Sequence, residues 1–234
     1  MNQLQRVALW NTTAGKPAAS LPLDHQLVQS QVGYVVEESE ELFKAVQEKD
    51  IVELLDAIGD TLVTVGGLMH LTGTTEYFSL RLCGGDPDGF ITTMDDESLF
   101  PKVDEIQRGV LQLKRQVSQE HSTIICENII SSLCGLADDL GFCPEAILKV
   151  VNDSNFTKFC RNPEDGKQTR LMYNRKDRYK NIRVNQVGNF WVVTGDDLLY
   201  NTKQKTLKSI YFEEPRRHLV DMVKEHGKFV EWIK

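Results

Sequence analysis

Two helical hydrophobic patterns follow each other early in the chain, separated only by a short break. Residues 24–46 place apolar side chains at three- and four-residue spacing, and residues 51–71 repeat that spacing. The break, at Lys49 and Asp50, is too short to serve as a linker. Because so short a connection turns one helix back along the other, we expect residues 24–71 to form an antiparallel helical hairpin.

Acidic side chains gather on both helices of the expected hairpin. Glu38 and Glu41 lie one turn apart on the first helix, and Glu38 falls within its apolar arc. Glu53, Asp56 and Asp60 share one stripe of the second helix at three- and four-residue spacing. A carboxylate that faces a core is costly unless a cation or hydrogen-bond donors compensate its charge.

Carboxylates that converge from two helices repel each other, and a hard divalent cation relieves this repulsion. Oxygen-only ligands favour Mg²⁺, with Mn²⁺ as an alternative, over zinc or copper. We therefore predict a magnesium site built from four or five of these carboxylates: Glu38, Glu41, Glu53, Asp56 and Asp60. The competing interpretation is that both stripes are solvated helix faces, although aspartate has a poor propensity for helix interiors and so favours a site.

Other kinds of site find less support in the sequence. No GxxxxGK[ST] loop, GxSxG elbow, HExxH pair or dinucleotide-binding glycine pattern occurs. None of the five histidines supplies the Glu-x-x-His pairs of a di-iron bundle. The five cysteines are odd in number and form no CxxC pair, which argues against a disulfide framework and against structural zinc.

After the expected hairpin, the helical spacing of apolar residues is interrupted before it returns further along the chain. We interpret residues 72–120 as an insertion, within which Asp86-Pro87-Asp88-Gly89 indicates a turn rather than a calcium loop. Helical periodicity returns at about Val103 and continues, with room for a bend, to Ala137. Pro144 then suits the first turn of a short helix that ends near Val151.

The last third of the chain carries strand-like patterns. Residues 158–183 are basic and irregular, and two strand-like runs follow at 189–194 and 206–212. The final stretch, 215–234, indicates a short amphipathic helix. We therefore expect the two strand-like runs to pair as a small antiparallel ribbon.

These patterns together predict a mainly α protein. Residues 1–160 would form a four-helix catalytic core with its insertion, and residues 161–234 would add the basic segment, the β ribbon and the C-terminal helix, packed on the core. No signal sequence and no apolar run of about 18 residues is present, so we expect a soluble, cytoplasmic protein. The net charge of −7 disfavours nucleic-acid binding, but it allows a phosphate-bearing substrate that binds through a cation.

A second candidate region opens the basic segment. Asn155-Phe156-Thr157-Lys158-Phe159 follows directly on a predicted helix, and the basic side chains after it suit a clamp for polyphosphate oxygens. The alternative is a mobile, solvated loop. Aromatic candidates for contact with the substrate are Trp10, Tyr34, Phe156 and Tyr179.

The acidic segments resemble the MazG-like all-α nucleoside triphosphate pyrophosphohydrolases, whose relatives include phosphoribosyl-ATP pyrophosphohydrolase and the all-α dUTPases and dCTPases. The family signature is EExxE on one helix and ExxD on the next. Glu37, Glu38 and Glu41 match the first element. Glu53 and Asp56 match the second element literally.

The second helix leaves one ligand position open. The run from Asp56 to Asp60 is also similar to the Asp-Ala-x-x-Asp form of phage-type members. On that alignment Asp60 takes the final position and Asp56 replaces the usual glutamate. We prefer this assignment, with Glu53 as a possible further ligand.

The resemblance implies a function and an assembly. It implies magnesium-dependent hydrolysis between the α- and β-phosphates of a nucleoside triphosphate, with Glu37 or Glu53 accepting a proton from water. Asn155 and Lys158 would contact the nucleotide or its phosphates. Family members form homodimers or homotetramers, and a phage-encoded member would act in the host cytoplasm. The alternatives are a phosphoribosyl-ATP pyrophosphohydrolase and a helical interaction module without enzymatic activity.

Overall fold

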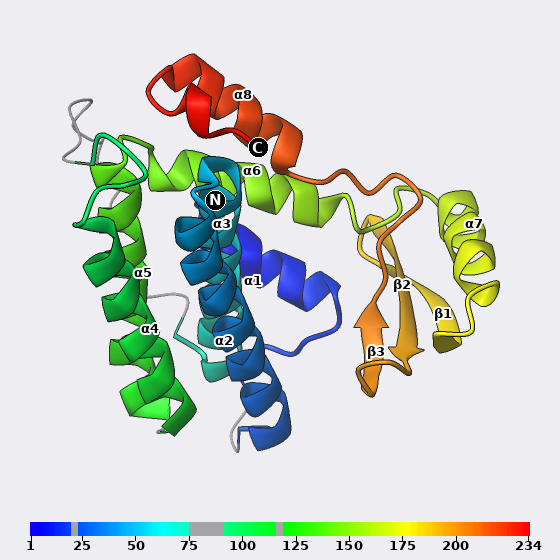
Figure 1. Cartoon of the computed structure of the whole chain (residues 1–234). Coiled ribbons are helices and arrows are strands. Elements are labelled where there is room, and N and C mark those ends of the chain that lie inside the picture. The colour runs from blue at the N-terminus through cyan, green and yellow to red at the C-terminus, as the bar shows by residue number, and fades with distance from the viewer. Residues whose placement is uncertain (20–22, 75–90, 116–118) are drawn as a thin grey trace. The chain divides into compact units, whose positions relative to one another are not determined.

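The computed structural model describes residues 1–19, 23–74, 91–115 and 119–234. Within these residues the chain forms eight α-helices and one three-stranded antiparallel sheet, which confirms the mainly helical class (Figure 1). They divide into two compact units. The first comprises Met1–Ala8, Pro17–Asn152 and Pro215–Lys234, and the second comprises Leu9–Lys16 and Asp153–Glu214.

The predicted helical hairpin is present in the first unit. Helix α2 (His25–Glu48) and helix α3 (Ile51–Thr72) pack against each other along their lengths (Figure 1). Asp24 and Asp50 cap the two helices, because each carboxylate accepts hydrogen bonds from two backbone N–H groups of the first turn. Lys49 ends α2 in the left-handed conformation, with φ of 55°. Both boundaries thus arise from local interactions.

Two further helices complete the core of the first unit. Helix α4 (Leu99–Arg115) packs against α2, and helix α5 (Gln119–Asp139) packs against both α3 and α4. The contacts of α2, α3, α4 and α5 therefore close into a ring around a shared apolar core. Members of that core from all four helices include Val35, Leu42, Leu55, Leu62, Ile106, Val110, Ile129 and Leu133.

The periodic segment predicted for residues 103–137 corresponds to two helices rather than one bent helix. Helix α4 already begins at Leu99, inside the stretch that we interpreted as an insertion. Its buried side chains belong to the main core, so residues 99–115 are part of the helical core. The predicted turn at residues 86–89 lies outside the described residues.

Three more helices lie wholly or partly in the first unit. Helix α1 (Gln3–Thr13), which the sequence patterns did not predict, buries Leu4 and Val7 against Gly66 of α3. Helix α6 (Pro144–Phe156) extends five residues beyond its predicted end at 151. Helix α8 (Arg216–His226) packs against α3, and a short 3₁₀ turn, Val230–Trp232, follows it.

The second unit contains the sheet and helix α7 (Pro163–Asn174). Strand β2 (Phe190–Asp197) lies between β1 (Tyr179–Val187) and β3 (Thr202–Thr206), and both pairings are antiparallel. The prediction of an irregular segment at 158–183 is wrong, because this segment contains α7 and the start of β1. The strand predicted at 206–212 is also wrong, since β3 ends at Thr206. Both β1 and β3 are largely polar, so they lack the apolar alternation that marks a half-buried strand.

Two smaller expectations concern cysteines and membranes. Cys126 is buried in the main core, as expected for a small apolar residue, and Cys134 is partly buried. Across the part of the chain that the structure describes, no helix combines the length and the apolar character needed to cross a membrane.

Candidate metal centre

The acidic side chains of the hairpin lie on two helices that are held together by a hydrogen bond as well as by apolar packing. Gln31 of α2 is buried, and its side-chain Nε2 donates to the backbone oxygen of Thr64 on α3 at 2.8 Å. One to two turns away, Glu38 on α2 and Asp56 and Asp60 on α3 are partly buried. The hairpin therefore keeps carboxylates of both helices at one interface, away from full hydration.

The charges of these acids converge on Glu38. The pKa of Glu38 is raised to about 8, mainly by burial and then by the negative charges of its acidic neighbours, which in decreasing order are Asp60, Glu41, Glu37 and Asp56. Coulombic repulsion weakens with distance, so these contributions indicate that acids of both helices are near enough for their charges to affect Glu38. The sequence prediction grouped these residues, and in the structure the charges of Asp60, Glu41, Glu37 and Asp56 act on Glu38.

Glu41 marks the solvated end of this acidic cluster, which consists of Glu37, Glu38, Glu41, Asp56 and Asp60. The Glu41 side chain is exposed to solvent. Its pKa is nevertheless raised, by partial burial and by the negative charges of Glu37 and Glu53, and the ammonium of Lys44 offsets part of this rise. Glu37 is also exposed, and its charge acts on both Glu38 and Glu41. The cluster thus runs from a partly buried interior at Glu38 to water at Glu41.

Glu53 has a basic partner that sequence analysis did not find. Its carboxylate forms an ion pair with Nη1 of Arg216, which belongs to α8. The same guanidinium lies 3.7 Å from the carboxylate of Asp50 and donates to the backbone oxygen of Lys234. Of the two residues that compete for the last ligand position, Glu53 is thus held by an arginine, whereas Asp60 acts directly on Glu38.

The side chains of the acidic cluster are of the chemical type that binds a hard cation. All the groups are carboxylates, and their mutual repulsion at Glu38 is the kind of stress that a divalent cation relieves. In their present conformations, however, no three Asp, Glu, His or Cys side chains of the described residues are arranged to hold a metal ion. Coordination of one ion would therefore require these side chains to move from their present positions.

The predicted phosphate contacts, Asn155 and Lys158, lie in the second unit and contact each other. The buried Asn155 accepts a hydrogen bond from Lys158 Nζ through its Oδ1 atom. Its backbone oxygen accepts another from the indole Nε1 of Trp10 at 2.8 Å. These three residues form one connected group.

The remaining aromatic candidates have different surroundings. Tyr34 is partly buried on α2, one turn before Glu38 and on the same face. Phe156 is partly buried in the second unit, where its ring lies 5.9 Å from that of Phe190. Tyr179 meets the ring of Tyr173 edge-on, with ring centres 4.9 Å apart. It packs against the small apolar core of the second unit, which consists of Cys160, Tyr173, Val193 and Leu207. Tyr179 therefore has a structural role that the sequence did not indicate.

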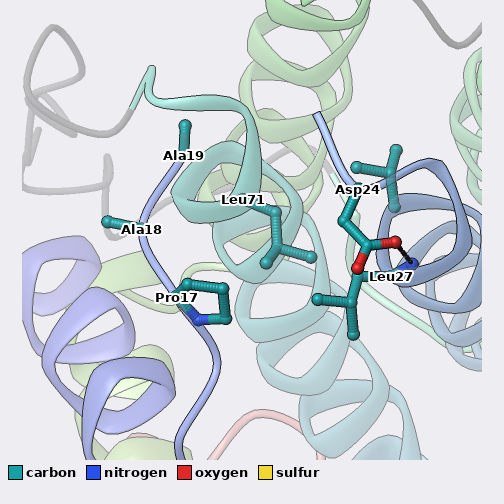
Figure 2. Close-up of a pocket in the computed structure, with 7 residues that line it drawn as sticks. Pro17, Ala18, Ala19, Asp24, Leu27 and Leu71 are labelled. Atoms are coloured by element: carbon teal, nitrogen blue, oxygen red, sulfur yellow. Dashed lines mark hydrogen bonds between the residues drawn. The ribbon is translucent and has the colours of Figure 1, made fainter. Parts of the chain in front are cut away.

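A shallow pocket in the first unit lies at the start of α2 (Figure 2). Its lining is mainly apolar: Pro17, Ala18, Ala19, Asp24, Leu27, Val28 and Leu71. Asp24 is the one acid among them, and its Oδ1 atom already accepts hydrogen bonds from the backbone of Gln26 and Leu27 as the cap of α2. None of the predicted site residues lines this pocket, so it adds nothing to the candidate metal centre.

Comparison with known proteins assigns no family. No family model matches the chain, and no solved structure matches it. The chain is similar to an uncharacterized protein of Acanthamoeba polyphaga mimivirus, with 26% identity over 234 residues that cover 90% of this chain and 92% of that protein. The similarity extends over nearly the whole of both chains, but it indicates no activity because the mimivirus protein is uncharacterized.

Proposed function

We propose that the protein is a metal-dependent nucleoside triphosphate pyrophosphohydrolase with a MazG-like helical core. It would cleave a ribo- or deoxyribonucleoside triphosphate between the α- and β-phosphates to give the monophosphate and pyrophosphate. The observation that carries the proposal is the convergence of acids from α2 and α3 on the partly buried Glu38. Action in the cytoplasm and assembly as a homodimer or homotetramer belong to the same proposal.

Four of the acids would hold the ion: Glu38, Glu41, Asp56 and Asp60. When bound, a magnesium or manganese ion supplies polarisation of the phosphoryl oxygens and lowers the pKa of a bound water. Asp60 is preferred to Glu53 as a ligand because Arg216 pairs with the Glu53 carboxylate.

In this proposal Glu37 is preferred to Glu53 as the general base. It is exposed, so its carboxylate is free to rotate, and its charge acts on both Glu38 and Glu41. A carboxylate at that position can accept a proton from the attacking water. Glu53 is less suited to this role because its carboxylate is already held in an ion pair with Arg216.

Asn155 and Lys158 would contact the nucleotide, as the resemblance implies. Lys158 supplies a positive charge for phosphate oxygens, and Asn155 fixes its ammonium group through the hydrogen bond to Oδ1. Their assignment rests on the sequence motif and on this contact.

The decisive experiment measures pyrophosphate release by the purified full-length chain with Mg²⁺. The panel contains the four ribonucleoside and four deoxyribonucleoside triphosphates together with phosphoribosyl-ATP. We expect at least one to be cleaved, and we expect Glu38→Gln and Asp56→Asn to lower the rate at least a hundredfold. Glu40→Gln is the matched control, since Glu40 is exposed on the same helix. If no compound is cleaved and Mg²⁺ does not bind, the protein is better explained as a helical interaction module.

A further inference from the structure

Two lysines from distant parts of the sequence lie beside Trp10 in the second unit. Nζ of Lys16 is 6.0 Å from the centre of the indole ring, and Nζ of Lys158 is 5.7 Å from it. Lys16 follows the end of α1, whereas Lys158 follows the end of α6. Both side chains are partly buried, so their ammonium groups are not fully hydrated.

The two ammonium groups repel each other. Burial and, to a smaller extent, the positive charge of Lys158 together lower the pKa of Lys16 to about 8. An anion that contacts both groups would relieve this repulsion. The arrangement therefore favours a negatively charged ligand.

The surroundings of the two lysines are ordered by hydrogen bonds and ring contacts. Trp10 donates its indole N–H to the backbone of Asn155 at 2.8 Å and stacks on Phe159, with ring centres 5.4 Å apart. Lys158 donates to the side chain of the same Asn155 and lies 5.7 Å from the ring centre of Phe212. Aromatic rings around partly buried charges reduce the local dielectric, which strengthens attraction to an anion.

We propose that Lys16 binds phosphate together with Lys158, so that the two lysines and Trp10 form a phosphate site in the second unit. Two ammonium groups provide several charge-assisted hydrogen bonds, which suits a phosphate or pyrophosphate group with several acceptor oxygens. The inference rests on the proposed function only for the source of the phosphate, which would be the nucleotide or the released pyrophosphate. Binding itself requires no residue of the acidic cluster.

The test follows pyrophosphate binding through Trp10 without any divalent cation. The chain has three tryptophans, so Trp191→Phe combined with Trp232→Phe leaves Trp10 as the fluorophore. We expect inorganic pyrophosphate to change its fluorescence saturably, and Lys16→Gln to weaken binding about tenfold. Lys16→Arg, which keeps the charge, should retain most of the affinity.

Lys167→Gln is the matched control, because Lys167 is exposed on α7 of the same unit and its removal changes the net charge equally. Unchanged binding in Lys16→Gln, or equal weakening in Lys167→Gln, would overturn the proposal. Sulfate at the same ionic strength should compete weakly, and full competition by sulfate would exclude a site selective for phosphate.

A second measurement on the wild-type chain covers the case in which Lys16→Gln fails to fold. Pyrophosphate should slow acetylation of Lys16 by acetic anhydride relative to that of Lys167, as measured by mass spectrometry. Equal rates with and without pyrophosphate would contradict the site. If Lys16 is protected but no nucleotide is cleaved, the phosphate site stands and the proposed hydrolase activity fails. If nucleotides are cleaved but Lys16 is not protected, only the phosphate site fails.

Discussion

Burial and the negative charge of Asp60 on α3 are the two largest causes that raise the pKa of Glu38 on α2 to about 8, and the charges of Glu41, Glu37 and Asp56 supply the rest of that rise. Glu38 is therefore protonated at neutral pH when no cation is bound, whereas an unfolded glutamate ionises near its ordinary pKa of 4.5. Between these two pKa values the folded state binds more protons than the unfolded state. Its stability accordingly decreases as pH rises through this window.

The first prediction is that Glu38→Gln removes this pH dependence. With a chelator present, the wild type should lose stability between pH 5 and pH 8, whereas the variant should not. At pH 8 the variant should be more stable by up to about 4 kcal/mol, because each pKa unit corresponds to about 1.4 kcal/mol, and its Tm should be higher by up to roughly 8–16 °C. Thermal unfolding followed by circular dichroism measures the difference, with Glu40→Gln as control. A variant that is less stable than the wild type at pH 8 would refute this account of Glu38.

The second prediction is that Mg²⁺ binding releases a proton from Glu38. Because the carboxyl group must ionise before it can bind a cation, affinity should rise with pH up to about 8. Isothermal titration calorimetry at pH 7, in buffers of different ionisation enthalpy, should show about one proton released per ion. In Glu38→Gln we expect at least tenfold weaker binding and almost no proton release. Affinity that does not change between pH 6 and pH 8 would rule this coupling out.

The third prediction separates the two candidates for the last ligand position. Glu53→Gln should leave Mg²⁺ affinity within about twofold of the wild type, since Arg216 already pairs with that carboxylate, whereas Asp60→Asn should weaken it at least tenfold. A double-mutant cycle of Glu53→Gln with Arg216→Gln should give a coupling of up to about 1 kcal/mol, as for other exposed ion pairs. The reverse order of the two affinities would make Glu53 the ligand.

The fourth prediction concerns Gly59, next to Asp60 in α3. A Cβ atom at Gly59 would lie 2.4 Å from Cγ2 of Val151 on α6, so the two helices approach closely there. Gly59→Ala should destabilise the first unit by about 1–3 kcal/mol in chemical denaturation. Adding Val151→Ala should recover part of the loss. Gly33→Ala is the control, because a Cβ atom at Gly33 meets nothing within 4 Å, and this change should be neutral or stabilising.

The fifth prediction concerns the buried Asp197 in the second unit. Its carboxylate accepts hydrogen bonds from Nε and Nη2 of Arg178 at 2.8 and 2.6 Å, and from Nζ of Lys205 at 3.2 Å. Asp197→Asn should destabilise this unit by about 1–3 kcal/mol, because it removes charge-assisted hydrogen bonds of a buried carboxylate, while the partly exposed Arg178 and Lys205 remain hydrated. Hydrogen exchange of β1, β2 and β3 would report the loss. Protection equal to that of the wild type would show that these ion pairs contribute little.

The helical hairpin could be predicted from sequence because its determinants are local. Apolar spacing defines the buried face of α2 and α3, and Asp24 and Asp50 cap them from within two or three residues. The predicted ends at residues 46 and 71 fall close to the observed ends at Glu48 and Thr72. The placement of Glu38 and Glu41 on one face follows from the same geometry.

The elements of the second unit were harder to predict because their burial depends on packing between them. Helix α7 and strand β1 are rich in polar and basic residues, and they bury only a few side chains, such as Thr169 and Tyr173. Neither element has a continuous apolar stripe. Their sequence therefore resembled that of a loop.

The sequence by itself determined which acids share a helix face and that two such faces meet in a hairpin. Only the tertiary structure decided what surrounds each charge. Arg216 reaches Glu53 across 163 positions of the chain, and Lys158 acts on Lys16 from a different helix end. The physical reason is that spacing sets the direction of a side chain on its own helix, whereas Coulomb interactions and desolvation depend on distances between segments that only folding brings together.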